Sequence, residues 1–188
     1  MFQNVRLNIT SLRIDLNNFW RNQQVVIGAV ILSAIAGSGC SNVTTDQYQA
    51  TAKTTYTWQV KYSINPTSDK LPRFETFIST SLVNRNGVKP VGAVVGPDER
   101  GLWWPHLPPR PTVDDIEQRK RTGEQPTAPQ LLKSVDYQMI YQIGDRTFTL
   151  PTNYQVYRQV VKAYPQKIPL QLTLGINDKS VEKAEPLK

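Results

Sequence analysis

The chain has 188 residues, of which 39% are apolar and 20% are charged, enough for one packed domain. The apolar fraction excludes a wholly disordered chain, and the lack of any apolar run near about 20 residues excludes a polytopic membrane protein. Lys and Arg outnumber Asp and Glu by 22 to 15, so the net charge is +7, without a polybasic tract.

An apolar run over residues 25–39 ends at Cys40, the single cysteine of the sequence. As a helix this run would be about 22 Å long, at roughly 1.5 Å per residue, against a hydrocarbon core of about 30 Å. That length is typical of a signal-peptide h-region, and the upstream charges favour a cytoplasmic N-terminus: Arg6, Arg13 and Arg21 against Asp15. We therefore expect export, with residues 25–40 as the h-region or as a retained anchor helix.

Residues 1–24 are long for an n-region. Apolar side chains recur in this segment at helical spacing: Val5, Ile9, Leu12, Leu16 and Phe19. The segment is therefore either a plain cytoplasmic n-region or an interfacial helix lying on the cytoplasmic leaflet.

Ser38, Gly39 and Cys40 resemble the lipobox of bacterial lipoproteins, in which small residues precede a cysteine that is acylated and becomes the new N-terminus. The resemblance covers only the first 40 residues and implies that Cys40 carries the lipid. Gly37 departs from the family pattern, which has Leu, Val or Ile at that position. Two alternatives stay open, cleavage after Ala36 by ordinary signal peptidase and an uncleaved anchor.

Residues 41–51 are polar and Thr-rich, which predicts a short tether between the anchor and a domain. After residue 40 the chain keeps 19 Lys and Arg against 14 Asp and Glu, a net charge of +5. A basic domain on so short a tether would lie close to the bilayer, where it would favour anionic headgroups or an acidic protein face.

From residue 52 the apolar side chains alternate strictly: Tyr56, Trp58, Val60, Tyr62 and Ile64 on one face. This predicts a half-buried strand. Between Pro72 and the Asn86-Gly87 stop signal, the apolar spacing favours a helix, although the Ser and Thr content leaves a strand as the alternative. Residues 88–95 are β-branched but contain Pro90, which predicts an edge strand or a strand beginning after the proline.

Residues 135–150 predict a β-hairpin with a two-residue type II′ turn at Gly144-Asp145. The implied register pairs Ile143 with Arg146, Tyr141 with Phe148 and Met139 with Leu150. Next, Thr152 and Gln155 resemble a capping box that opens a helix ending at Pro165. A strand over residues 168–176 and a frayed polar tail over residues 177–188 complete the prediction.

The order of these elements predicts an α+β domain over residues 52–176. It consists of an antiparallel sheet of about five strands with helices on one face, preceded by the N-terminal signal or anchor helix.

The Pro- and Trp-rich segment 96–111 is the least ordinary stretch, with two of the four tryptophans and the only histidine. Its prolines favour an extended path, and Trp103 and Trp104 offer a large flat apolar area. One interpretation is a partner-docking arm whose binding residues are Trp103, Trp104, His106 and Arg110. The other is a lid, in which the two tryptophans fold back over the domain's own sheet.

The sequence gives little support for a catalytic or metal-binding role. His106 alone supplies at most one soft ligand, and no cofactor motif or nucleophile signature accompanies it, so we expect no cofactor and no metal site. Asp114, Asp115 and Glu117 are typical of the acidic first turn of a short helix capped by Thr112. Nucleic acid is not expected as a partner, because the protein is expected to be exported and the basic run at residues 119–121 is short and close to acidic residues.

Residues 102–112 resemble a stretch in uncharacterised membrane-anchored proteins of cyanobacteria, which implies a thylakoid or envelope location and an accessory role. The leading hypothesis is a non-enzymatic extracytoplasmic domain, anchored to the membrane and facing the periplasm or thylakoid lumen. It would dock a protein partner within a membrane-associated complex. The alternatives are a small enzyme using His106 with Asp98 or Glu99, and an envelope protein that binds lipid or glycan.

Overall fold

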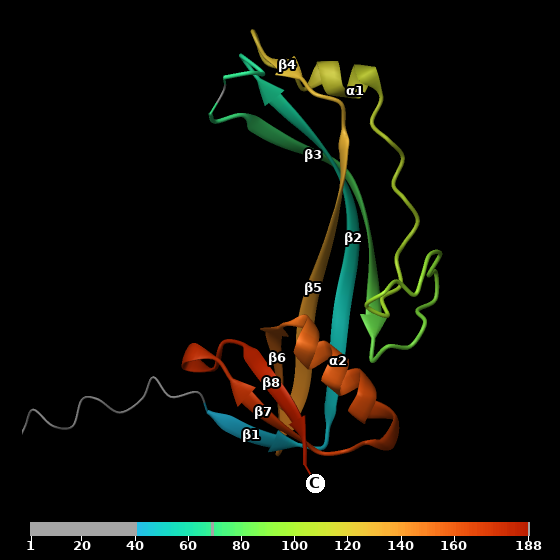
Figure 1. Ribbon diagram of the computed structural model, residues 1–188, viewed down its shortest axis with the longest axis vertical. Helices are drawn as coiled ribbons and strands as arrows, with labels where there is room; N and C mark the ends of the chain where they lie inside the picture. The colour runs from blue at the N-terminus through green and yellow to red at the C-terminus, as the bar shows by residue number, and fades with distance from the viewer. Residues whose placement is uncertain (1–40, 69, 188) are drawn as a thin grey trace, which may run out of the picture. The chain divides into compact units, whose positions relative to one another are not determined.

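The computed structural model describes residues 41–68 and 70–187, and the strands among them form a single sheet (Figure 1). The predictions made for residues 1–24, for the apolar run and for Cys40 lie outside the described residues. In the described part of the chain, no helix is long and apolar enough to cross a bilayer.

The sheet of the described residues has eight strands in the order β1-β7-β8-β6-β5-β2-β3, with β4 paired to β2. The strands are β1 (Asn42–Thr45), β2 (Tyr48–Ser63), β3 (Arg73–Arg85), β4 (Gln125–Pro126), β5 (Gln130–Ile143), β6 (Arg146–Thr152), β7 (Leu170–Leu174) and β8 (Val181–Pro186). All neighbours are antiparallel except β6 and β8, which are parallel.

The predicted fold class, an α+β domain with about five antiparallel strands, is wrong. Strands make up 48% of the described residues and helices 15%, so this part of the chain is mostly sheet, and the sheet is mixed. The extra strands come from segments with no apolar alternation. The segment expected to be a tether contains β1 and the start of β2, and the expected polar tail contains β8.

The segment 73–85 forms a strand rather than the favoured helix. It pairs with β2 along its whole length, and a register shift lies between Thr57 and Gln59 of β2. Across this bulge, Thr57 pairs with Ser79 while Gln59 pairs with Thr76, so Phe77 and Ile78 share one position opposite Trp58. The extra residue breaks the alternation and produces an apolar spacing that imitates a helix.

Residues 88–95 do not form the predicted strand. They contribute only isolated bridges, between Arg85 and Val88 and between Val95 and Trp104. Pro90 removes one backbone donor from this segment, and the chain turns away from β3 at Asn86 and Gly87, both of which have positive φ.

The predicted hairpin is confirmed, with the three expected pairs in register and Gly144 at φ +55°. Helix α2 (Tyr154–Ala163) and strand β7 are also confirmed. The cap of α2 differs from the prediction, because Asn153 accepts from the Val156 amide while the Thr152 hydroxyl donates to the Val181 carbonyl at 2.6 Å. Helix α1 (Val113–Gln118) begins at the predicted cap, Thr112, which forms a capping box with Asp115.

One face of β2 is covered by three different elements along its length. Near its start, Ala50 and Ala52 belong to the main core together with Val156, Tyr157 and Val160 of α2. Near its end, Val60 and Tyr62 form a second core with Ile116 of α1. Between these two cores lie Thr54, Tyr56 and Trp58, and this middle stretch is where the Pro- and Trp-rich segment crosses. The side chains of β2 under α2 are small, whereas those under the Pro- and Trp-rich segment include the rings of Tyr56 and Trp58.

Candidate functional site

The Pro- and Trp-rich segment lies along the same face of β2 that the two helices cover. Its backbone accepts two side-chain hydrogen bonds from the strand, Thr54 Oγ1 to the Trp103 carbonyl at 2.8 Å and Trp58 Nε1 to the Pro108 carbonyl at 2.9 Å. Further along the same face, Tyr62 Oη donates to the Ile116 carbonyl of α1 at 2.8 Å. The segment held at Thr54 and Trp58 is a lid over its own sheet.

Of the two tryptophans, Trp104 belongs to the packed interior and Trp103 is half-buried. The ring of Trp104 lies 4.9 Å from that of Tyr56, and its Nε1 donates to Asp98 Oδ2 at 2.9 Å. The Nζ of Lys89 lies over the ring of Trp103, 5.0 Å from the ring centroid, in a cation–π contact. The lid interpretation therefore accounts for Trp104, and docking by that ring would require the lid to open.

His106 and Arg110 are both exposed. The His106 carbonyl accepts from the Thr80 hydroxyl, and the Arg110 guanidinium lies 5.9 Å from the centroid of Trp58. The structure does not join His106 to Asp98 in the described chain. Both oxygens of Asp98 are used instead by Trp104 and by the Arg100 and Leu102 amides.

Asn84, on β3, is a fully buried polar side chain that sequence reasoning missed. Its Oδ1 accepts from the Trp103 amide at 2.7 Å, and its Nδ2 donates to the Trp103 carbonyl at 3.0 Å and to the Ala52 carbonyl at 3.1 Å. One side chain thus joins β3, β2 and the lid. The available signal was a carboxamide at an inward-facing position of a strand, where an apolar residue is usual.

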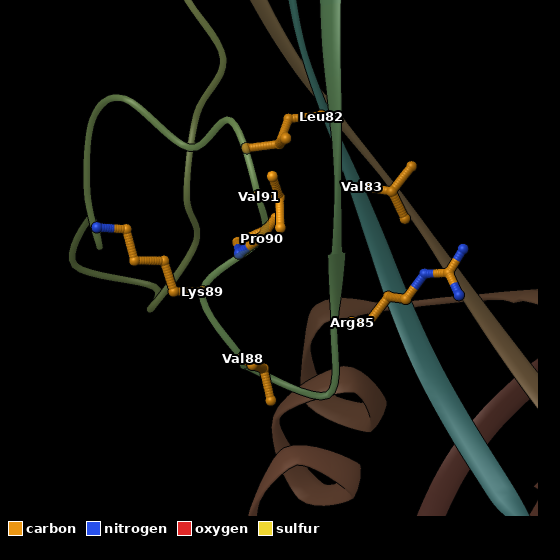
Figure 2. A pocket seen from close by; sticks show the side chains of 7 residues that line it. All are labelled: Leu82, Val83, Arg85, Val88, Lys89, Pro90 and Val91. Carbon is orange, nitrogen blue, oxygen red and sulfur yellow. The ribbon is translucent and has the colours of Figure 1, made fainter.

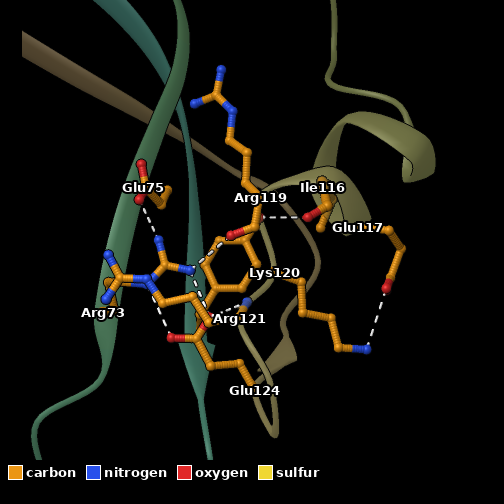
Figure 3. A network of polar contacts seen from close by, with 9 residues as sticks. Arg73, Glu75, Ile116, Glu117, Arg119, Lys120, Arg121 and Glu124 are labelled. Atoms are coloured by element: carbon orange, nitrogen blue, oxygen red, sulfur yellow. Dashed lines mark hydrogen bonds and ion pairs between the residues drawn. The ribbon is translucent and has the colours of Figure 1, made fainter.

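Beyond α1, a cluster of charges joins the 119–124 turn to β3 (Figure 3). Arg73 binds Glu124 with two nitrogens, Nε to Oε1 at 3.0 Å and Nη2 to Oε2 at 2.6 Å, and it also pairs with Glu75. The Arg121 amide donates to Glu124 at 2.9 Å. The hydrogen bond from Arg73 is the main reason that the pKa of Glu124 falls to about 2.

Glu124 should therefore make unfolding depend on pH in the acid range. Because its pKa is lower in the folded chain than its ordinary value of 4.5, its contribution is complete above about pH 4.5 and is lost as the pH falls toward 2. We expect Glu124→Gln to flatten the decline of the urea midpoint between these two pH values. The exposed Glu99→Gln is the matched control, and an equal flattening in both variants would contradict the assignment.

An apolar groove lies at the outer edge of β3, where the chain leaves that strand (Figure 2). Its volume is about 460 Å³, and seven residues line it: Leu82, Val83, Arg85, Val88, Lys89, Pro90 and Val91. Leu82 and Val91 lie on one side of the strand and Val83 and Arg85 on the other, so the groove borders both faces of the sheet edge. Val88 and Val91 are largely or fully exposed.

No other strand pairs with β3 along this outer edge, since β3 ends the strand order of the described sheet, although the Arg85 carbonyl accepts from the Val88 amide at 2.9 Å. The Asn86 amide donates to the Ala50 carbonyl at 2.9 Å, which fixes the direction of the backbone groups. Because these groups alternate along a strand, Asn84 and Leu82 also face β2, whereas Ser81 and Val83 direct their N–H and C=O groups outward. A free strand edge with apolar side chains on either side can accept another extended chain.

Within the described residues, no group of three or more His, Cys, Asp or Glu side chains could hold a metal ion. No family model, curated protein or solved structure matches this chain.

Proposed function

We propose that this protein is a membrane-anchored extracytoplasmic accessory domain that binds an extended acidic segment of a partner protein along the free edge of β3. The observation that carries the proposal is the unpaired outer edge of β3 beside the apolar groove. Main-chain hydrogen bonds to such an edge provide affinity, and alternate side chains of the added strand enter the neighbouring apolar surface.

The positive charges beside the groove favour an acidic partner. Arg85 and Lys89 border the groove, and neither forms an ion pair with another described residue. The sequence after residue 40 has a net charge of +5. An acidic strand would bring its carboxylates to these cations while its apolar side chains contact the exposed valines.

The position of the groove suits a partner near the membrane. The described chain begins at Ser41 and enters β2 at Tyr48, and the groove lies beside that same end of β2, where Thr51 pairs with Arg85. Lipid attachment at Cys40, as the lipobox resemblance implies, would hold this end of the domain close to the bilayer. We therefore assign docking to the edge of β3 rather than to the tryptophan pair, because Trp104 is buried against Tyr56 of β2.

A pair of designed peptides tests the proposal on the full chain in detergent. A ten-residue peptide that alternates Val with Asp should bind at least about tenfold more tightly than one that alternates Val with Lys. Fluorescence anisotropy of labelled peptides measures both affinities. Val83→Asp should weaken binding of the acidic peptide at least about tenfold, because it places a carboxylate on the edge.

Val113→Asp is the matched control, since Val113 is an exposed valine in α1, far along the chain from the groove. It should leave the affinity of the acidic peptide unchanged. Equal affinity for the two peptides, or equal loss in both valine variants, would refute docking at the edge of β3.

A further inference from the structure

The first described residue, Ser41, is fixed to the turn between β7 and β8. Its carbonyl accepts from the Leu174 amide at 2.8 Å, and its Oγ donates to Asp178 Oδ1 at 2.5 Å. Cys40 is bonded directly to Ser41 in the sequence. A membrane attachment that ends at Cys40, whether a lipid or a retained apolar helix, therefore ends beside this turn.

The turn, residues 175–180, is closed by its own backbone. The Gly175 amide donates to the Ser180 carbonyl at 2.9 Å, and the Asp178 amide donates to the Gly175 carbonyl at 3.0 Å. Asn177 and Asp178 both have a φ of +55°, a left-handed conformation that these two residue types adopt more readily than most others. The sequence thus specifies a tight turn at this position rather than an open loop.

Ile176 is the apolar side chain of this turn, and it lies at the surface. The residue is 72% exposed, and the rest of the turn consists of glycine, asparagine, aspartate, lysine and serine. So exposed an aliphatic group contributes little to the core of the domain. Burial between lipid headgroups and acyl chains, about 5–10 Å deep, would remove it from water.

The charges next to Ile176 are compatible with such a contact. Asp178 accepts from the Ser41 hydroxyl, and Glu182 accepts from the Ser180 hydroxyl at 2.6 Å. Lys179 is exposed and forms no ion pair with another described residue. Its ammonium group is therefore available to the phosphate of a lipid headgroup.

We infer that the β7–β8 turn is a second membrane contact, in which Ile176 enters the boundary between headgroups and acyl chains beside the anchor. The inference rests on the membrane attachment in the proposed function. An anchor at one residue leaves the domain free to tilt, whereas a contact at the adjacent turn favours one orientation on the bilayer.

Dyes attached at single positions of the full chain test this contact in phosphatidylcholine vesicles. Ile176→Cys places the dye in the turn, and Val113→Cys is the matched control. Val113 is also β-branched and is 74% exposed, and its helix α1 packs at the far end of the 16-residue strand β2. The background from Cys40 is measured on the parent chain and subtracted.

The dye at position 176 should be quenched by nitroxide lipids, and it should be at least about threefold less accessible to aqueous iodide than the dye at position 113. Equal iodide accessibility at the two positions would overturn the inference.

A third position separates the role of Ile176 from simple nearness to the anchor. The dye in Lys179→Cys should also be shielded from iodide. Adding Ile176→Asp should raise its iodide accessibility at least about twofold, because a carboxylate resists transfer out of water. Adding Val113→Asp instead should leave the accessibility unchanged. Equal shielding with and without Ile176→Asp would refute the role of Ile176.

Intact mass and vesicle flotation report on the anchor separately. An anchored chain, with acyl mass on Cys40 or with residues 1–39 retained, whose dye at position 176 is open to iodide would overturn the turn contact alone. The proposed function would then stand. A chain that begins at Gly37 and does not float would remove the anchor from the proposed function, and the membrane contact with it.

Discussion

Replacing Trp104 with alanine is expected to lower the free energy of unfolding by about 3–5 kcal/mol, the range for removal of a buried aromatic side chain. Trp104 is 7% exposed, its ring packs against that of Tyr56 at a centroid distance of 4.9 Å, and its Nε1 donates to Asp98. The substitution leaves a cavity between the lid and β2, and it leaves a carboxylate oxygen without its donor. Because small domains have a total stability of only about 5–15 kcal/mol, such a loss removes much of it.

Two further variants separate the contributions of the ring and of the hydrogen bond to this loss. The stability of all three variants is measured by urea denaturation with a tryptophan-independent signal such as far-ultraviolet circular dichroism. Trp104→Phe keeps an aromatic ring over Tyr56 and removes the hydrogen bond, so it should cost less than alanine. Trp103→Ala removes a half-buried ring and should cost clearly less than Trp104→Ala. If both alanine variants lie within about 1 kcal/mol of the parent chain, the lid does not form part of the core.

Sequence patterns predicted the elements in which one physical signal dominates. The alternation before Ser63 identified β2, and the Gly144 turn agreed with the flanking pattern, so turn geometry and burial both fixed the register of β5 and β6. Helix α2 was recognisable because its apolar stripe and its proline stop agree. Each of these elements can be recognised from a short stretch of sequence.

The missed elements depend on partners far along the chain. Strand β1 has only Val43 as an aliphatic residue, yet it pairs with β7 about 130 residues later. Strand β8 lies between β7 and β6, although its sequence is polar. In β3, the bulge opposite Trp58 changes which residues face inward. The local sequence pattern does not predict a bulge at this position. Of the five predicted strands, four are strands of the described sheet, and the sheet reaches eight strands with β1, β3, β4 and β8.

For the candidate sites too, the local sequence revealed some features, and others depend on contacts between distant parts of the chain. Sequence reasoning selected Trp103, Trp104, His106 and Arg110 because the composition of segment 96–111 is unusual, and it offered the lid as an alternative. Whether the lid covers the sheet depends on two side-chain donors on β2, Thr54 and Trp58, and only the fold reveals how they align with the backbone carbonyls of the segment. The groove was hidden for the same reason. Its valines belong to a segment predicted to be a strand, and the free edge is a property of strand order.

Replacing Asn84 with alanine is expected to destabilise the domain by about 2–4 kcal/mol, although the change removes only a few atoms. The side chain is fully buried and forms three hydrogen bonds to the backbone of Trp103 and Ala52. Without it, the Trp103 amide loses its acceptor, and a buried unsatisfied donor costs about 1–3 kcal/mol by itself. The rest of the loss comes from two carbonyls that lose a donor and from the small cavity left behind.

Urea denaturation measures this loss, and two substitutions show where it arises. Thr54→Val keeps the side-chain shape and removes one donor to the Trp103 carbonyl, so it should cost only about 1 kcal/mol. Asn84→Asp should cost more than alanine at neutral pH, because a buried carboxylate cannot donate and would face the Ala52 and Trp103 carbonyls. Its deficit should shrink as the pH falls and the carboxylate takes up a proton. An Asn84→Ala variant as stable as Thr54→Val would mean that the lid holds its place without Asn84, through the Trp104 and Trp58 contacts alone.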